Sequence, residues 1–116
     1  MPDNDAPVRD TLEVMTAASL ENSNLPPREL MIVRLAALAA VDAPAASYAL
    51  NVEAATEAGL TLDDVQDVLL AVAPIVGTTR VVSAAAKIAE GLGLVIALAE
   101  AELEAELEAE EDGLPS

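Results

Sequence analysis

The chain has 116 residues, of which 53% are apolar, and a formal net charge of −16, so it is long enough for one small domain with a hydrophobic core. It contains no cysteine and no histidine, which excludes disulfides and thiol catalysis and removes the commonest general base and zinc ligand. The excess negative charge repels phosphate backbones and anionic lipid, so we expect neither a nucleic-acid partner nor a membrane partner.

The N-terminal part of the sequence predicts two helices joined by a polar turn. The first is predicted over residues 7–19, with Leu12 and Met15 on its apolar side. The second is predicted over about residues 27–41 and begins at Pro27, because proline is tolerated in the first turn of a helix. This second helix is apolar nearly all round, which is typical of a helix buried on several sides.

Turn and capping residues predict two further helices in the middle of the chain. Asp42 is predicted to cap a third helix that carries Pro44 in its first turn and ends at Gly59. Thr61 is predicted to cap a fourth helix, whose first turn holds two aspartates. We expect this fourth helix to end or kink just before Pro74.

A fifth helix is predicted to restart at Gly77 and to continue beyond Gly91 and Gly93, which weaken it locally. Residues 100–116 hold eight acids and no base. We expect this acidic extension to pack on a neighbouring subunit and to fray beyond Leu107, because like charges four residues apart repel each other.

The domain organisation follows from these elements. Residues 1–6 are predicted to be disordered, residues 7–99 to form one helical domain, and residues 100–116 to form the acidic helical extension and tail. The first residues lack the apolar segment of a signal peptide, and no apolar run approaches the ~20 residues that cross a bilayer. We therefore expect a cytoplasmic protein.

The apolar residues are unusually small. There is no phenylalanine, no tryptophan and a single tyrosine, so alanine, leucine, valine and isoleucine must build the interior. Such side chains bury little area each, and at about 25 cal/mol per Å² a lone domain gains modest stabilisation. Association with further copies would bury more, so we expect a homo-oligomer.

The segment over residues 44–61 resembles the central helix of the carboxymuconolactone decarboxylase family, which includes the alkylhydroperoxidase D-like thiol peroxidases. In the peroxidase branch this helix carries C-x-x-C-x-x-x-H, with the histidine eight residues before a glycine. Counting back from Gly59 places Asn51 at the histidine position and Ser47 and Pro44 at the two cysteine positions. All three reactive groups are therefore replaced.

The resemblance covers about residues 25–92 and begins with Leu-Pro-Pro-Arg-Glu-Leu at residues 25–30. It implies an all-α, alkylhydroperoxidase D-like domain of about five helices that assembles as a trimer or hexamer. We expect the helices over residues 44–58 and 61–73 to lie against each other as a hairpin. The sequence lacks the two cysteines that thiol peroxidase activity requires. No cofactor is expected. The decarboxylase branch usually keeps a histidine where Asn51 stands, and asparagine cannot accept a proton at neutral pH.

Arg34 is the first candidate for ligand binding. It lies on an apolar stripe, four residues from both Leu30 and Leu38. A guanidinium there would grip a substrate carboxylate through two parallel hydrogen bonds. The alternative is a structural ion pair, or a side chain that extends to the surface.

Ser47, Tyr48 and Asn51 are the other candidates, because offsets of three and four place them on one helix face. They would line a cavity and bind a ligand by hydrogen bonds. The alternative is that Tyr48 is a packed aromatic side chain and that Asn51 satisfies a backbone carbonyl.

The remaining polar groups have simpler interpretations. Arg28 is expected to serve the start of its helix. Arg80, Ser83 and Lys87 form a weakly basic face that suits a subunit contact with an acidic segment. The aspartates that open the fourth helix are explained by the helix dipole, so we expect no metal site.

Two functions remain open from the sequence. The protein either binds or acts on a small carboxylated or lactone compound, as a thiol-independent, decarboxylase-like lyase if it is an enzyme. Alternatively, it is a non-catalytic oligomeric binding or structural module with a vestigial site.

Overall fold

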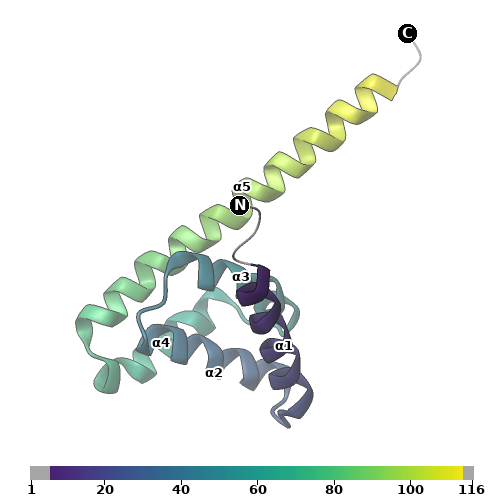
Figure 1. Cartoon of the computed structure of the whole chain (residues 1–116). Helices are drawn as coiled ribbons and strands as arrows, with labels where there is room; N and C mark the ends of the chain where they lie inside the picture. Colours follow the sequence, from purple (N-terminus) through teal and green to yellow (C-terminus); the bar gives the residue numbers. More distant parts are fainter. Residues whose placement is uncertain (1–5, 114–116) are drawn as a thin grey trace.

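The computed structural model describes residues 6–113, with side chains up to residue 110. Five helices and no strand occur within these residues (Figure 1). They are α1 (Ala6–Asn22), α2 (Pro27–Ala40), α3 (Ala45–Glu57), α4 (Leu62–Val76) and α5 (Thr78–Gly113). The predicted all-α class is therefore confirmed. The disorder predicted for residues 1–6 lies outside the described residues except at Ala6, which is already helical.

The bundle consists of α2, α3, α4 and the first half of α5. Both α3 and α4 pack on α2 and on α5, but α3 and α4 make no close backbone contact with each other. The predicted hairpin of these two helices is therefore wrong, because α2 and α5 come between them. The buried core has one aromatic residue and otherwise small or aliphatic ones, as the composition implied: Leu35, Ala39, Ala43, Tyr48, Val68, Leu69 and Ala84.

Asp42 ends α2 instead of capping α3. Its φ is +54°, which lies in the left-handed region. The amides of Asp42 and Ala43 donate to the carbonyls of Ala39 and Leu38, the pattern of a Schellman motif that ends a right-handed helix. The N-cap of α3 is Pro44, which forms no side-chain cap. The predicted cap is wrong because aspartate tolerates the left-handed region that the end of α2 requires.

The turn between α3 and α4 follows the prediction closely. Gly59 has φ +84°, and the amide of Leu60 donates to the carbonyl of Ala55, so α3 stops with the same pattern. Thr61 then caps α4: its hydroxyl accepts from the amide of Asp64, and the Asp64 carboxylate accepts from the amide of Thr61.

Pro74 does not end α4, which continues to Val76 and stops at Gly77, where φ is +97°. A proline removes one hydrogen bond, here to the carbonyl of Leu70. Leu70 and Pro74 are both exposed, so water can satisfy that carbonyl and the helix continues to its end.

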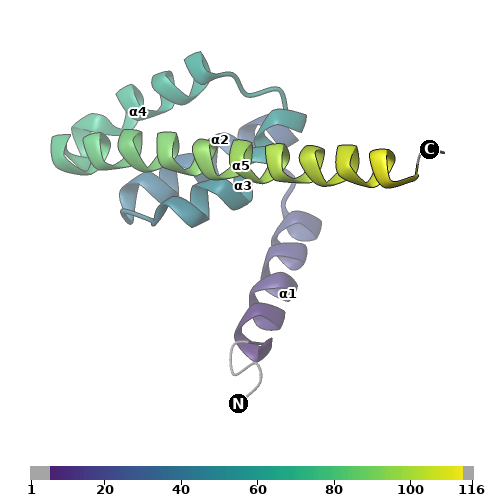
Figure 2. The same cartoon turned by 90° about the horizontal axis from the view of Figure 1, so that it is seen from above.

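Two helices extend beyond the bundle. Every side chain over residues 97–110 of α5 is exposed, and the helix is continuous to Gly113, so the predicted fraying beyond Leu107 is not observed. The N-terminal helix α1 also projects away from the bundle (Figure 2).

By length and composition alone, α5 between Thr78 and Glu110 is apolar enough to cross a membrane. The sequence had predicted no such segment, because no uninterrupted apolar run approaches ~20 residues. The helix carries Lys87 and Glu90 within its first half, and Ala84 and Gly91 of that half are buried in the bundle. The first half of α5 is thus a wall of the folded domain.

Candidate functional site

The bundle contains a cavity of about 380 Å³ between α2, α3, the start of α4 and α5. Its fifteen lining residues all have uncharged side chains: Met31, Leu35, Leu38, Tyr48, Asn51, Val52, Ala55, Thr56, Leu60, Thr61, Leu62, Val65, Ile88, Leu92 and Ile96.

Gly91 brings α3 and α5 together beside the cavity. A Cβ atom on Gly91 would lie 2.9 Å from the carbonyl oxygen of Ala45 and 3.2 Å from the amide nitrogen of Ala49. Only glycine allows the backbones to approach so closely. Beyond this contact, the C-terminal half of α3 lines the cavity. From the sequence alone, Gly91 was expected only to weaken its helix locally.

Tyr48 is the one aromatic residue of the cavity wall, and it is only 4% exposed. Its hydroxyl is buried and has no hydrogen-bond partner. Burial, and to a smaller extent the negative charge of Asp42, raise the pKa of this hydroxyl. It therefore stays protonated at neutral pH, and its oxygen is buried away from the open space of the cavity.

Asn51 is half-buried at the cavity wall, and its Nδ2 donates to the carbonyl oxygen of Ser47 at 2.8 Å. The structure thus shows the bond to a backbone carbonyl that was the alternative interpretation of this residue. One N–H and the Oδ1 atom of the amide remain for a molecule in the cavity. The hydroxyls of Thr56 and Thr61 bond to Val52 and Asp64, so they are already satisfied.

The four predicted site residues do not meet in one place. Tyr48 and Asn51 line the cavity, whereas Arg34 and Ser47 do not. Arg34 Nη2 donates to the hydroxyl of Ser19 on α1 at 3.3 Å. A guanidinium at this position contacts the N-terminal helix and does not reach a ligand in the cavity.

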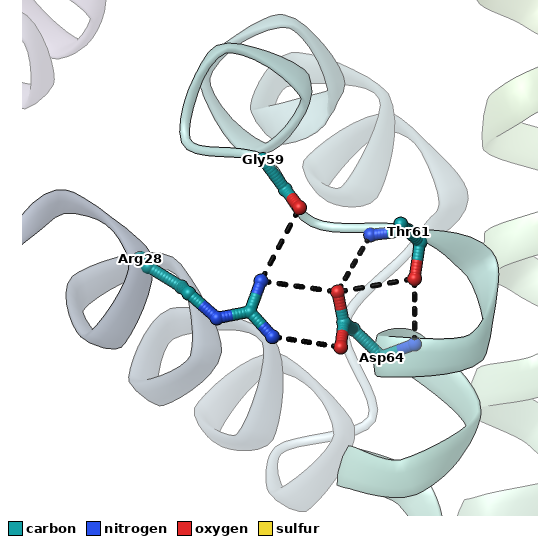
Figure 3. Close-up of polar contacts among 4 residues, drawn as sticks. All are labelled: Arg28, Gly59, Thr61 and Asp64. Carbon is teal, nitrogen blue, oxygen red and sulfur yellow. Dashed lines mark hydrogen bonds and ion pairs between the residues drawn. The ribbon is translucent and has the colours of Figure 1, made fainter.

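Arg28 holds the loop at one edge of the cavity (Figure 3). Its Nη2 and Nη1 donate to the two carboxylate oxygens of Asp64 at 2.7 and 3.1 Å, and Nη1 also donates to the carbonyl of Gly59 at 3.2 Å. These bonds, with those from Thr61, keep the pKa of Asp64 well below its usual range. These hydrogen bonds from Arg28 to Asp64 and Gly59, called the Arg28 clamp below, hold the turn that carries Leu60. Arg28 therefore does more than serve the start of its own helix.

The basic face of α5 is occupied within its own chain. Arg80 donates to the carbonyl of Ala40, while Ser83 and Lys87 donate to Asp42 Oδ1 at 2.7 and 2.9 Å. The hydrogen bond from Lys87, followed by that from Ser83, lowers the pKa of Asp42. This face contacts the C-terminal end of α2, where positive charge is favourable. The subunit contact expected of it stays a prediction.

Among the described residues, no group of three or more carboxylates is placed to hold a metal ion. The chain matches the family described as Carboxymuconolactone decarboxylase family over residues 7–91. Comparison with curated proteins and with solved structures gives no significant match.

Proposed function

The chain belongs to the carboxymuconolactone decarboxylase family, and we propose that it binds a small, uncharged and largely apolar molecule, such as a lactone, in the cavity beside Tyr48. The observation that supports this most strongly is the cavity itself. Its volume of about 380 Å³ lies within the range of about 300–1,000 Å³ for small-molecule pockets. An apolar wall with a few polar groups is also typical of such pockets.

The chemistry of the wall favours a neutral ligand over a carboxylate. The lining side chains are uncharged, and Arg34, which was expected to grip an anion, bonds to Ser19 outside the cavity. An ionised carboxylate would lose its hydration there without gaining a partner of opposite charge, which is strongly unfavourable. A lactone presents the same carbonyl chemistry without that cost.

Asn51 is the polar group left to orient a ligand. Its amide retains an acceptor oxygen and one N–H, and that N–H can donate to a carbonyl oxygen on the ligand. The hydroxyl of Tyr48 has no partner but is buried away from the open space, so Tyr48 contributes the apolar part of its side chain to the wall.

We propose binding, not turnover. Proton transfer needs a side chain whose pKa suits it, and the lining residues supply only hydroxyls, one amide, one thioether and hydrocarbon. Thiol peroxidase chemistry is excluded because the chain contains no cysteine.

A non-catalytic assembly module is the second candidate. It is favoured by the large exposed apolar side chains on α1 and on the part of α5 beyond the bundle, among them Val14 and Leu98. The trimer or hexamer implied by the family belongs to this proposal.

Thermal unfolding in the presence of γ-nonalactone, with sodium nonanoate as the matched carboxylate, tests the binding proposal. A neutral ligand at ten times its dissociation constant adds about 1.4 kcal/mol of stability, or about 4–8 °C for a domain of this size. Ala55→Leu, which fills the cavity, should abolish the shift. The control Ala54→Leu changes an exposed neighbour on the same helix and should preserve it. Equal shifts for both variants, or a shift with nonanoate alone, would contradict the proposal.

A further inference from the structure

The mouth of the cavity lies at the turn between α3 and α4. The exposed members of its lining are Thr56, Thr61, Leu62 and Ile96. All but Ile96, which lies on α5, belong to the end of α3, to this turn or to the first residue of α4. The lining residues Met31, Leu35 and Tyr48 are buried, so the cavity is closed on their side. Its open side is therefore bounded by Ile96 and by the segment over residues 59–62, called the 59–62 turn below.

The 59–62 turn is the part of the cavity wall that is least fixed by packing. Leu60 and Thr61 are the two lining residues outside a helix. A Cβ atom on Gly59 would meet nothing within 4 Å, so no other element packs against the turn there. Among the described residues, every hydrogen bond that reaches the turn or Asp64 from outside α3 and α4 comes from Arg28 (Figure 3). The Arg28 clamp therefore joins the turn to α2.

The clamp is strong in geometry but open to solvent. Arg28 lies in the first turn of α2, where Pro26 and Pro27 restrict the backbone. Its planar guanidinium reaches three acceptors at once, which an ammonium group cannot reproduce. The side chains of Arg28 and Asp64 are 47% and 23% exposed. Ion pairs with this exposure contribute little to the stability of a domain, so the clamp can open without unfolding of the bundle.

We propose that the Arg28 clamp controls access to the cavity. While Arg28 bonds to Gly59 and Asp64, the 59–62 turn is held against α2 and the mouth is narrow. When these bonds open, the turn moves outward and a ligand enters or leaves. Arg28 does not line the cavity, so it is a positioning residue that acts through the lining residues of the turn. Its role rests on the ligand site proposed above, but the movement itself needs no ligand.

Thiol labelling measures the movement without a ligand, because the chain contains no natural cysteine. Leu60→Cys places a thiol on the half-buried, cavity-lining part of the turn. We expect Arg28→Met to speed its reaction with N-ethylmaleimide about ten-fold, because the rate follows the population of the open form. Arg28→Lys should speed it less, since lysine can keep one of the bonds. Loss of the positive charge alone would make the thiol less reactive, so charge cannot cause the increase.

Two controls separate the turn from the rest of the bundle. Arg80→Met removes another arginine that bonds to α2, at the carbonyl of Ala40 and outside the cavity lining, and should leave the rate at position 60 unchanged. Ala39→Cys places a thiol in the buried core, where the rate should not respond to Arg28→Met. Equal rates at position 60 for Arg28→Met and Arg80→Met, or equal acceleration at positions 39 and 60, would overturn the proposal. Arg28→Lys decides in the same way if Arg28→Met does not fold.

Titration with γ-nonalactone connects the turn to the ligand. The lactone should leave Arg28→Met about ten-fold faster than Arg80→Met, the change expected when about 55 Å² of apolar contact with the turn is lost. Line shapes of the Tyr48 ring signals measure both rates, and equal rates would overturn the proposal. If the natural protein binds no lactone, the ligand proposal fails, and the labelling rates still decide whether the clamp holds the turn.

Discussion

Replacing Gly91 by alanine tests how closely α3 and α5 approach each other. The added Cβ would lie 2.9 Å from the Ala45 carbonyl oxygen, 3.2 Å from the Ala49 amide and 3.4 Å from the Tyr48 Cβ. Two of these three atoms belong to the backbone of α3, so the clash cannot be relieved by a change of rotamer. The helices must separate, and the buried Tyr48 must move with them.

Gly93 provides a matched control two residues away on the same helix, because a Cβ there meets nothing within 4 Å. Alanine is favoured over glycine in a helix by about 1 kcal/mol at either position. That gain cancels when the two variants are compared, and the difference in their free energies of unfolding is the cost of overpacking, about 1–3 kcal/mol. We expect Gly93→Ala to be slightly more stable than the natural protein and Gly91→Ala to be less stable than Gly93→Ala by that amount.

Urea and thermal unfolding followed by circular dichroism at 222 nm measure this difference, which corresponds to at least about 4 °C in Tm. If Gly91→Ala unfolds at the same temperature as Gly93→Ala, α5 does not approach α3 at this residue. The cavity walls described above would then be misplaced as well.

Three further predictions concern single contacts. Tyr48→Phe should raise the free energy of unfolding by about 1 kcal/mol without ligand, because it removes a buried hydroxyl with no partner; a loss of stability in urea titration would reveal a partner. Thr61→Ala should cost about 1 kcal/mol through loss of the helix cap, whereas Thr56→Ala, inside α3, should cost less; equal losses in thermal unfolding would argue against the cap. The pKa of Asp64 is lowered mainly by Arg28, so its contribution is complete above the unfolded value of 3.8 and is lost as the pH falls below it. The free energy of unfolding of Arg28→Met should therefore fall less between pH 5 and pH 3 than that of the natural protein. If the two free energies fell in parallel with pH, the ion pair of Arg28 with Asp64 would be refuted.

The features that the sequence predicted correctly depend on neighbouring residues. Thr61 with an acid three residues later forms a capping box, and Gly59 supplies a positive φ at the end of α3. Helical periodicity and the breaks at turn residues gave the number of helices and the all-α class. Asp42 was assigned to the wrong helix, because aspartate suits both the N-cap of a helix and the left-handed residue that ends one. Which of the two roles it takes depends on how Pro44 begins the next helix.

The features that the sequence could not supply depend on distant residues. Arg28 and Asp64 are 36 positions apart, and Asp42 and Lys87 are 45 apart, so periodicity contains no signal for either pair. Arg34 was expected at the cavity because it lies on an apolar stripe, but that stripe does not specify which neighbour it faces. The position of the cavity follows from the packing of α3 and α4 on α2 and α5, which no local pattern encodes.

The central claim, that the uncharged cavity beside Tyr48 binds a neutral molecule, is tested most directly by proton NMR. Tyr48 is the only aromatic residue in the sequence, so its ring protons are the only aromatic side-chain signals of the protein, and γ-nonalactone has none. We predict saturable shifts of these signals on titration with the lactone, and nuclear Overhauser effects between the ring and the ligand. Ring signals that stay unchanged at millimolar lactone, with no such effects, would contradict the claim.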